Sequence, residues 1–353
     1  MAATRIGDFE IIDEIGIGGM AVVYKARQLS LDRLVALKVP RPEFTGDAEF
    51  AARFTQEARH AARLNHPNAA AVYSTGEVAG AQYIAMEFVE GESLATRLAR
   101  LRKLSPREAV SIALHALGAL EAAHAAGIIH RDVTPKNILL DVRTGYAKLV
   151  DFGIARALGA ASMTQVGLLV GAPPYMSPEQ IQGGPLDGRS DLYSLGLVLY
   201  EMLTGCRPHT GDTPMAVVQR RLTTAPPAAA AVDPSVPADL SQLVARAMAL
   251  DPAQRFQTAE EFRQALLYWR QGAQPAPAFV GPPAPAWPSY ASVVTPAPVA
   301  AEAAPTPAPP AVPMAAPAAL PEERKRGLTV VTVVLLVLAA LVVGVVLGAI
   351  LGR

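Results

Sequence analysis

The sequence predicts an α+β protein in which a strand-rich part precedes a mostly helical part. Alternating apolar and polar residues, typical of strands, occur before about residue 91, whereas long stretches after residue 105 have helical spacing. Proline and alanine then dominate residues 271–321, and residues 328–351 form an uncharged apolar run. We therefore expect a folded region over 9–270, a disordered linker over 271–326 and a transmembrane helix over 327–351.

The composition narrows the class of function. The 353 residues carry 31 basic and 31 acidic side chains, so nothing in the net charge indicates nucleic acid as a partner. The one cysteine, Cys206, excludes an internal disulfide framework and has no histidine nearby at metal-ligand spacing. Residues 1–8 lack the apolar core of a signal peptide, so we expect no such peptide there.

A glycine-rich stretch follows the first strand pattern, which begins at Phe9. Residues 15–24 read Ile-Gly-Ile-Gly-Gly-Met-Ala-Val-Val-Tyr and lead into a second strand pattern. In a dinucleotide-binding fold the glycines would instead open a helix. A glycine hairpin lets backbone amides approach phosphate groups without a Cβ in the way, so we expect it to cover a triphosphate. Ala21 stands where a third glycine is usual, and we expect a stiffer loop because alanine disfavours positive φ.

A third strand is predicted over residues 34–39. Alternation places Val35, Leu37 and Val39 on one face, and Ala36 and Lys38 on the other. A flat adenine can lie against the small alanine while the lysine reaches phosphate oxygens. A lysine in a strand is often only a solvated charge, but its position after a glycine hairpin favours phosphate binding.

A helix is predicted over residues 50–64, and it ends at the Asn-His-Pro-Asn turn of residues 65–68. Its apolar positions fall near one side: Phe54, Ala58, Ala61 and Ala62. Glu57 sits among them, and His66 in the turn is interpreted as structural. Residues 83–91 read as a further strand followed by a connecting segment.

The helical part begins with a clear start signal. Ser105 is placed at the N-cap, Pro106 at the first helical position and Glu108 two residues later, and the helix is expected to end at Gly127. It leads into residues 130–137, which read His-Arg-Asp-Val-Thr-Pro-Lys-Asn. This stretch is the centre of the functional argument.

Three side chains beyond this helix have the spacing that phosphoryl transfer from ATP–magnesium uses. Asp132 and Asn137 lie in the loop, and Asp151 begins an Asp-Phe-Gly sequence fourteen residues after the asparagine. With these motifs the chain resembles the protein kinase superfamily, and most of all the membrane-bound Ser/Thr kinases of bacteria. The resemblance covers about 260 of the 353 residues.

The resemblance implies a two-lobed protein kinase fold. A small antiparallel-sheet N-lobe would occupy residues 9–86, a hinge 87–91 and a mostly helical C-lobe 92–270. It also implies an ATP- and Mg²⁺-dependent enzyme that phosphorylates Ser/Thr hydroxyls of protein substrates.

The resemblance assigns a role to each motif residue. Asp132 accepts or orients the hydroxyl proton, Lys38 pairs with Glu57, and Asn137 and Asp151 ligate magnesium through hard oxygen atoms. The resemblance also implies that Met86 is the gatekeeper and that the hinge residues bind adenine through their backbone. The implied nucleotide site comprises Ile15, Gly16, Ile17, Gly18, Gly19, Met20, Ala21, Val22, Val23, Ala36, Lys38, Glu87, Val89 and Leu139.

The segment after the Asp-Phe-Gly sequence contains two candidates for activating autophosphorylation, Ser162 and Thr164. By the resemblance, Arg131 would pair with such a phosphate and order the loop. The alternative is that these are unmodified loop hydroxyls. The resemblance also implies structural roles for three residues. Glu179 and Arg255 would form a buried ion pair, and Asp191 would brace the loop of residues 130–137.

The chain departs from the kinase pattern at two positions that normally contact each other. Thr134 stands where most Ser/Thr kinases have a phosphate-contacting lysine, and Ala172 stands where they have the threonine that contacts that lysine. Lys136 is our hypothesis for the missing positive charge. The departure leaves open the rate and the hydroxyl preference, and a membrane-tethered ATP-binding pseudokinase scaffold is the alternative function.

The last part of the chain reads as a spacer and a membrane anchor. Residues 271–321 contain fifteen prolines, so they favour extended states with an upper reach on the order of 150 Å. An SH3- or WW-type docking motif within 308–313 is the alternative to a spacer. The run 328–351 is long enough to cross a bilayer, and Arg-Lys-Arg at 324–326 precedes it.

These features predict a single-pass, tail-anchored protein of the inner membrane with its kinase domain in the cytoplasm. Small residues recur every fourth position in the apolar run, with Gly344 and Gly348 at their centre. This pattern predicts a homodimer through the transmembrane helix. Ordinary small-residue content of an alanine-rich chain is the alternative.

Overall fold

The computed structural model describes residues 5–44, 47–78, 80–152 and 174–272, which belong to one compact unit within residues 1–295. Ser162, Thr164, Ala172, the linker and the apolar run with Gly344 and Gly348 lie outside the described residues. Within the described part, every helix is too short or too polar to cross a bilayer.

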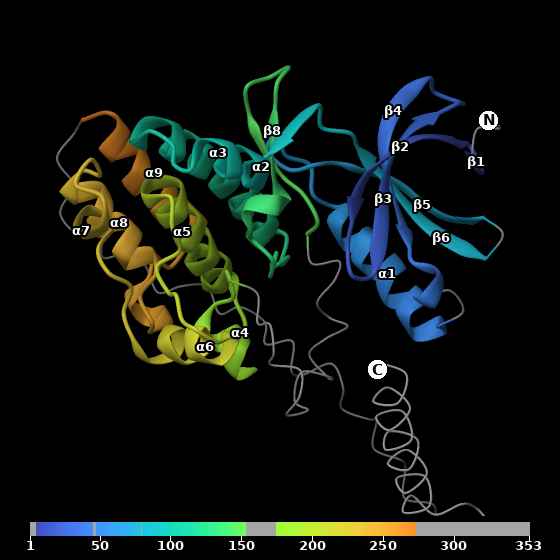
Figure 1. The fold of residues 1–353 in the computed structure, drawn as a ribbon. Coiled ribbons are helices and arrows are strands. Elements are labelled where there is room, and N and C mark those ends of the chain that lie inside the picture. Colours follow the sequence, from blue (N-terminus) through green and yellow to red (C-terminus); the bar gives the residue numbers. More distant parts are fainter. Residues whose placement is uncertain (1–4, 45–46, 79, 153–173, 273–353) are drawn as a thin grey trace, which may run out of the picture. The chain divides into compact units, whose positions relative to one another are not determined.

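The N-terminal part is a six-stranded antiparallel sheet (Figure 1). Its strands, in spatial order, are β1 (Arg5–Ile6), β2 (Phe9–Ile17), β3 (Ala21–Gln28), β4 (Arg33–Pro40), β6 (Ala81–Glu87) and β5 (Val72–Val78). The glycine-rich stretch forms the hairpin between β2 and β3, as the sequence predicts.

The two faces of β4 pack as its alternating pattern predicts. Val35 and Leu37 are buried in one cluster with Phe9. Ala36 points into a second cluster, where it packs with phenylalanines from helix α1 (Ala48–Ala61), which lies against the sheet in Figure 1. Burial on both sides fixes the register of β4, since a slip of one residue would exchange its faces.

Helix α1 differs from its predicted range at both ends. It begins earlier because the Asp47 carboxylate accepts hydrogen bonds from the amides of Glu49 and Phe50, both at 3.0 Å, and so caps the first turn. It ends at Ala61, and Ala62 is an exposed C-cap residue, so its predicted place on the apolar side is wrong.

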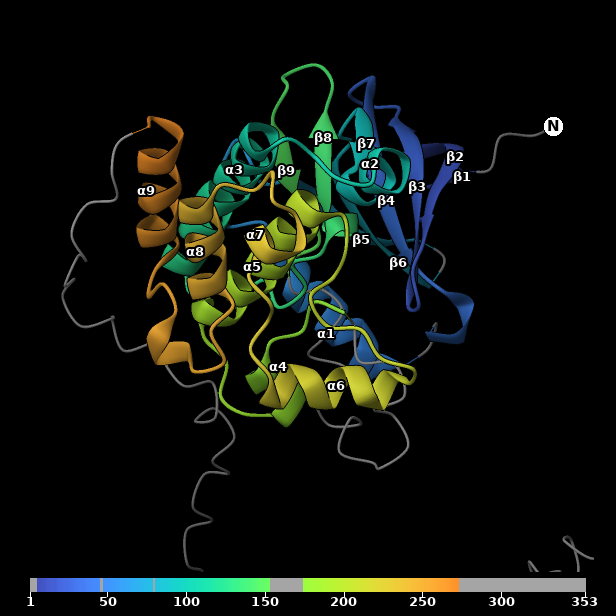
Figure 2. The same ribbon diagram turned by 60° about the vertical axis from the view of Figure 1, so that its left-hand side comes forward.

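The C-terminal part is mostly helical and carries one small sheet (Figures 1 and 2). Its helices are α2 (Leu94–Leu101), α3 (Pro106–Ala125), α4 (Pro178–Gln182), α5 (Gly188–Thr204), α6 (Pro214–Thr223), α7 (Ala229–Val232), α8 (Ala238–Ala247) and α9 (Ala259–Arg270). The sheet has the order β7 (Gly91–Ser93), β8 (Ile138–Asp141) and β9 (Ala147–Leu149). Short 3₁₀ turns are η1 (Pro42–Phe44), η2 (Pro135–Asn137) and η3 (Pro252–Gln254).

Helices α3 and α5 form the centre of this part. Both are apolar on most sides and largely buried, as expected of helices surrounded by others. The predicted ends of α3 are confirmed, because Ser105 Oγ accepts the Glu108 amide at 3.3 Å and Gly127 has a φ of +73° just beyond the helix. Helix α9 packs along α3, where Arg263 Nε donates to Glu121 Oε2 at 2.8 Å (Figure 1).

Candidate active site

Strand β4 brings Lys38 to the segment that follows β9. Lys38 Nζ lies 2.8 Å from Asp151 Oδ1, and the lysine side chain is only 10% exposed. Asp151 adopts a positive φ of 60°, a conformation that non-glycine residues seldom adopt without support from their surroundings. The structure therefore joins two of the predicted site residues from distant parts of the chain.

The catalytic loop, residues 130–137, brings together two further predicted site residues, Asp132 and Asn137. Asn137 Nδ2 donates to the main-chain oxygen of Asp132 at 2.8 Å and to its carboxylate Oδ2 at 2.9 Å. The loop closes through the turn η2, and the amide of Val150 donates to the main-chain oxygen of Asn137 at 2.9 Å. Because both bonds from the Asn137 side chain use its nitrogen, its amide oxygen remains available to a cation.

Asp191 of α5 braces the same loop, as the sequence resemblance implied. Its carboxylate, only 1% exposed, accepts the amide hydrogens of His130 at 2.9 Å and Arg131 at 2.8 Å, and lies 2.8 Å from His124 Nε2. Burial raises the pKa of Asp191, but the hydrogen bond and charge of His124 outweigh burial and lower it. The ionised carboxylate can thus hold Arg131 at its positive φ of 65°.

Three contacts in this region have no signal in the sequence. The rings of His130 and Phe152 lie 4.7 Å apart, and His130 Nε2 is 2.9 Å from the main-chain oxygen of Val150. His124 reaches Asp191 from the last turn of α3, where a histidine in an alanine-rich helix gives no hint of its partner. These contacts link the loop to the Asp-Phe-Gly sequence and to α3.

The glycines of the hairpin leave room near the backbone, and they do not adopt positive φ. Gly16, Gly18 and Gly19 all have ordinary backbone conformations, but a Cβ on Gly18 would lie 3.1 Å from the Ala21 oxygen. A Cβ added at Gly19 would meet no atom within 4 Å, so this side of the residue is open to a ligand. Ala21 begins β3 without positive φ, and the stiffening of the loop by this residue stays a prediction.

The other residues of the predicted nucleotide site come from the glycine hairpin, from the sheet beside it and from β8. Ile15 and Ile17 are exposed on β2, whereas Met20 and Val23 pack with the cluster that contains Ala36. Leu139 lies half-buried on β8. The exposed isoleucines are apolar surface that a flat ring can cover.

The hinge begins at Glu87, whose side chain is engaged elsewhere. Its carboxylate binds Lys148 Nζ at 2.8 Å, and its amide donates to the Ala71 oxygen at 2.8 Å. Val89 is buried and Met86 packs against α1. The contact of Glu87 and Val89 with adenine through their backbone groups stays a prediction, and the Glu87 amide is already engaged by Ala71.

Two predicted catalytic residues do not gain a partner from the described contacts. Glu57 lies in α1, but its side chain is outside the described part, so the ion pair with Lys38 stays a prediction. Lys136 is exposed on η2, and Thr134 occupies the position before this turn. The hypothesis that Lys136 replaces the usual lysine is likewise untested.

The predicted ion pair of the C-terminal part is confirmed. Arg255 is completely buried, and its Nη1 lies 2.8 Å from Glu179 Oε1. The same guanidinium donates to the main-chain oxygens of Ala249 at 2.7 Å and Leu250 at 3.0 Å. Burial raises the pKa of Glu179, but the hydrogen bond and charge of Arg255 outweigh it and lower the pKa.

Comparison with known proteins agrees with this geometry. Residues 9–267 match the family described as "Protein kinase domain". The chain belongs to this family. It is 43% identical over 273 residues to the serine/threonine-protein kinase PknB of Mycobacterium tuberculosis, covering 76% of this chain and 44% of PknB. It is 41% identical over 255 residues to the serine/threonine-protein kinase PrkC of Bacillus subtilis, covering 72% of this chain and 39% of PrkC.

The chain thus spans about two fifths of the length of these bacterial relatives. Among solved structures, the kinase domain of Mycobacterium tuberculosis PknI superposes with a TM-score of 0.59 at 32% identity, covering 76% of this chain and 98% of that one. The two-lobed protein kinase fold is therefore confirmed.

Membership of the protein kinase family implies the use of ATP and a divalent metal ion. Among the described residues, no group of three or more His, Cys, Asp or Glu side chains could hold a metal ion alone. The donors at hand are Asp151 and Asn137, both oxygen ligands. This sparse set fits Mg²⁺, which typically takes one or two protein ligands and completes its shell with substrate phosphates and water.

Proposed function

We propose that this chain is an ATP- and Mg²⁺-dependent protein kinase that phosphorylates serine and threonine hydroxyls of proteins. The observation that carries the proposal is the convergence of two pairs, Lys38 with Asp151 and Asp132 with Asn137. The names of the bacterial relatives, PknB and PrkC, support the choice of serine and threonine.

The chain's own residues would divide the work of phosphoryl transfer. Lys38 would hold phosphate oxygens beneath the glycine hairpin, in a position that Asp151 fixes. Asp132 would accept or orient the hydroxyl proton, and Asn137 holds this aspartate by one hydrogen bond to its carboxylate and one to its main-chain oxygen. Magnesium bound at Asn137 and Asp151 would neutralise charge on the phosphates. Positioning and charge stabilisation supply most of the rate in this chemistry.

The test is phosphate incorporation from γ-labelled ATP into the protein itself and into a general protein substrate. Asp132→Asn keeps the shape of the side chain but removes the base, so we expect incorporation to fall by on the order of 10²-fold or more. Asp239→Asn, at the exposed start of α8, is the matched control and should retain wild-type activity. Wild-type protein that binds ATP but incorporates no phosphate would contradict the proposal.

That contrary result would favour the second candidate, a membrane-tethered ATP-binding pseudokinase scaffold. The observation behind it is Thr134, which stands before η2 where a phosphate-contacting lysine is usual. A thermal shift on adding ATP with Mg²⁺ would register binding independently of transfer. Binding without transfer is expected of the scaffold, whereas both are expected of the kinase.

We also propose that Ser162 or Thr164 is an autophosphorylation site and that the run 328–351 anchors the kinase domain to the cytoplasmic face of the inner membrane. The hydropathy of this run and the basic residues at 324–326 support the anchor. Phosphosite mapping of wild-type protein beside Asp132→Asn tests the first point. Fractionation with and without residues 327–353 tests the second.

A further inference from the structure

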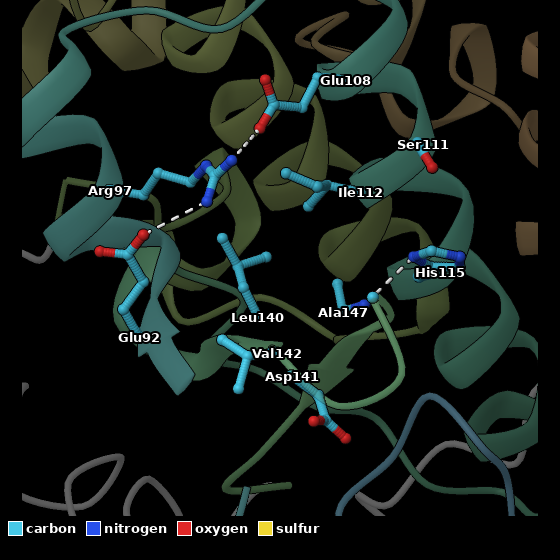
Figure 3. A pocket seen from close by; sticks show the side chains of 11 residues that line it. Glu92, Arg97, Glu108, Ser111, Ile112, His115, Leu140, Asp141, Val142 and Ala147 are labelled. Carbon is cyan, nitrogen blue, oxygen red and sulfur yellow. Dashed lines mark hydrogen bonds and ion pairs between the residues drawn. The ribbon is translucent and has the colours of Figure 1, made fainter. Parts of the chain in front are cut away.

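A pocket of about 270 Å³ lies on the C-terminal part, outside the candidate active site (Figure 3). Helices α2 and α3 and the β8–β9 hairpin surround it. Its lining includes Ile112, His115, Leu140 and Val142, and none of its residues belongs to the nucleotide or catalytic set. Pockets for small molecules typically measure about 300–1,000 Å³, so this one is of a size for side chains of a peptide.

The charges around the pocket already balance one another. Arg97 binds Glu108 at 2.7 Å through Nη2 and Glu92 at 3.3 Å through Nη1. The Asp141 carboxylate accepts the amide hydrogen of Arg143 at 2.8 Å, within the hairpin. A charged ligand would have to break these contacts, so the pocket favours an uncharged one.

The floor and one rim are apolar and aromatic. Figure 3 shows Ile112, Leu140 and Val142 between the charged group around Arg97 and the ring of His115. Val142 is 71% exposed and Tyr146, whose ring lies 4.9 Å from that of His115, is 48% exposed. A groove that combines apolar side chains with nearby aromatic rings can bind an extended proline-rich peptide, because such a peptide is largely ordered before it binds.

The chain leaves the C-terminal part beside this pocket. Helix α9 runs along α3, held by Arg263 and Glu121, and ends at Arg270. Arg270 is close enough to His115 for its positive charge to add to burial in lowering the pKa of the histidine. The end of α9 therefore lies near the wall of the pocket.

The sequence that follows has the composition such a pocket would accept. No charged residue occurs between Arg270 and Glu302, and prolines recur throughout. The aromatic residues of 273–326 are confined to its first third, at Phe279, Trp287 and Tyr290. A plain spacer needs no aromatic side chains. Their position next to the folded part therefore favours a contact with it.

We propose that residues 275–288 of this chain dock onto this pocket, with the Phe279 ring inserted over Leu140 and Val142. Nine residues separate Phe279 from Arg270, which gives a reach of about 28 Å in an extended chain. Docking holds the start of the linker against α3 and the β8–β9 hairpin, so the spacer to the membrane begins there and not at the end of α9.

The test uses the full chain in detergent, with a benzophenone amino acid placed at position 279. We expect crosslinks to peptides containing residues 138–147, mapped by mass spectrometry. The matched control carries the same group at position 303, which should crosslink there far less. Val142→Asp places a carboxylate against the inserted ring and should lower the yield several-fold, whereas Val142→Thr should retain most of it.

Because Val142 is exposed on a hairpin, neither change threatens the fold; unchanged thermal unfolding of both variants verifies this. Mixing isotopically heavy and light chains separates docking within one chain from docking between copies. Crosslinks confined to like-labelled peptides support the proposal. Three results would each overturn it. These are crosslinks between heavy and light chains, equal yields from positions 279 and 303, and a yield that Val142→Asp leaves unchanged.

Discussion

Lys38 Nζ and Asp151 Oδ1 lie 2.8 Å apart although 113 residues separate them in the sequence. The pair connects β4 of the N-terminal sheet to the segment after β9. The lysine is nearly buried, so removing Asp151 leaves the lysine charge poorly solvated. The two residues therefore define both the geometry of the proposed phosphate site and its sensitivity to substitution.

Lys38→Met should abolish most phosphoryl transfer while leaving the fold intact. Methionine retains the length of the lysine stem but loses the charge that would hold phosphate oxygens, so we expect the rate to fall by on the order of 10²-fold or more. Lys103→Met, which removes a lysine paired with Asp233 on the C-terminal part, is the matched control. Incorporation of label by the Lys38 variant within about twofold of wild type would refute the assigned role.

Lys136→Ala tests whether this lysine replaces the one missing at Thr134. If its charge reaches the transferring phosphate, kcat should fall by about tenfold or more while the KM for ATP changes little, because the contact matters most in the transition state. Arg143→Ala, on the exposed β8–β9 turn, controls for loss of a nearby surface charge. An unchanged kcat in Lys136→Ala means that the enzyme works without a cation at this position.

Gly344→Leu combined with Gly348→Leu should prevent association of the full chain in detergent. Leucine at both positions would separate two helices that small residues allow to approach closely. Val342→Leu with Val346→Leu, each two positions before one of the glycines, should leave association unchanged. Analytical ultracentrifugation measures both, and equal dimer fractions in all three proteins would refute the helix dimer.

The outcome at each element shows what the sequence could and could not predict. Local signals worked: Ser105 and Gly127 mark the ends of α3, and alternation gave both faces of β4. The start of α1 was missed because its cap, Asp47, precedes the apolar pattern on which the prediction relied. Local rules thus fail where a polar cap extends an element beyond its apolar face.

Some contacts between residues far apart in the sequence could not be predicted either. His124 and Asp191 stand 67 residues apart, and Lys148 and Glu87 stand 61 apart, so only the tertiary fold brings them together. The motifs nevertheless fixed Asp132 as a site residue, since its neighbours follow a known spacing. The resemblance could therefore single out Asp132 and its brace Asp191, whereas the partner of that brace, His124, could not be predicted.

His209 should make stability fall as the solution becomes mildly acidic. Burial, assisted by the charges of Arg221 and Arg220, lowers its pKa from 6.5 to about 4. Between these values the unfolded chain binds a proton that the folded chain does not, so stability is lost as pH decreases from 6.5 towards 4. We expect the decline in Tm between pH 7 and 5 to be smaller in His209→Phe than in wild type.

The control for this experiment is Val218→Ala, which weakens the neighbouring helix α6 without removing a titrating group. Its Tm should be lower at every pH but decline with the wild-type slope. A His209→Phe profile parallel to wild type would show that the histidine does not titrate on unfolding in this range.

Glu179→Gln should destabilise the protein at neutral pH, and the difference should narrow in acid. The variant leaves the buried Arg255 charge without its counter-ion, which costs about 3 kcal/mol or more. Because Arg255 lowers the pKa of Glu179 below 4.5, the contribution of the ion pair is complete above pH 4.5 and is lost as pH falls further through the folded-state pKa. Urea unfolding of both proteins from pH 7 to pH 3 measures the difference. A difference that is absent at pH 7, or that stays constant down to pH 3, would contradict this account of the pair.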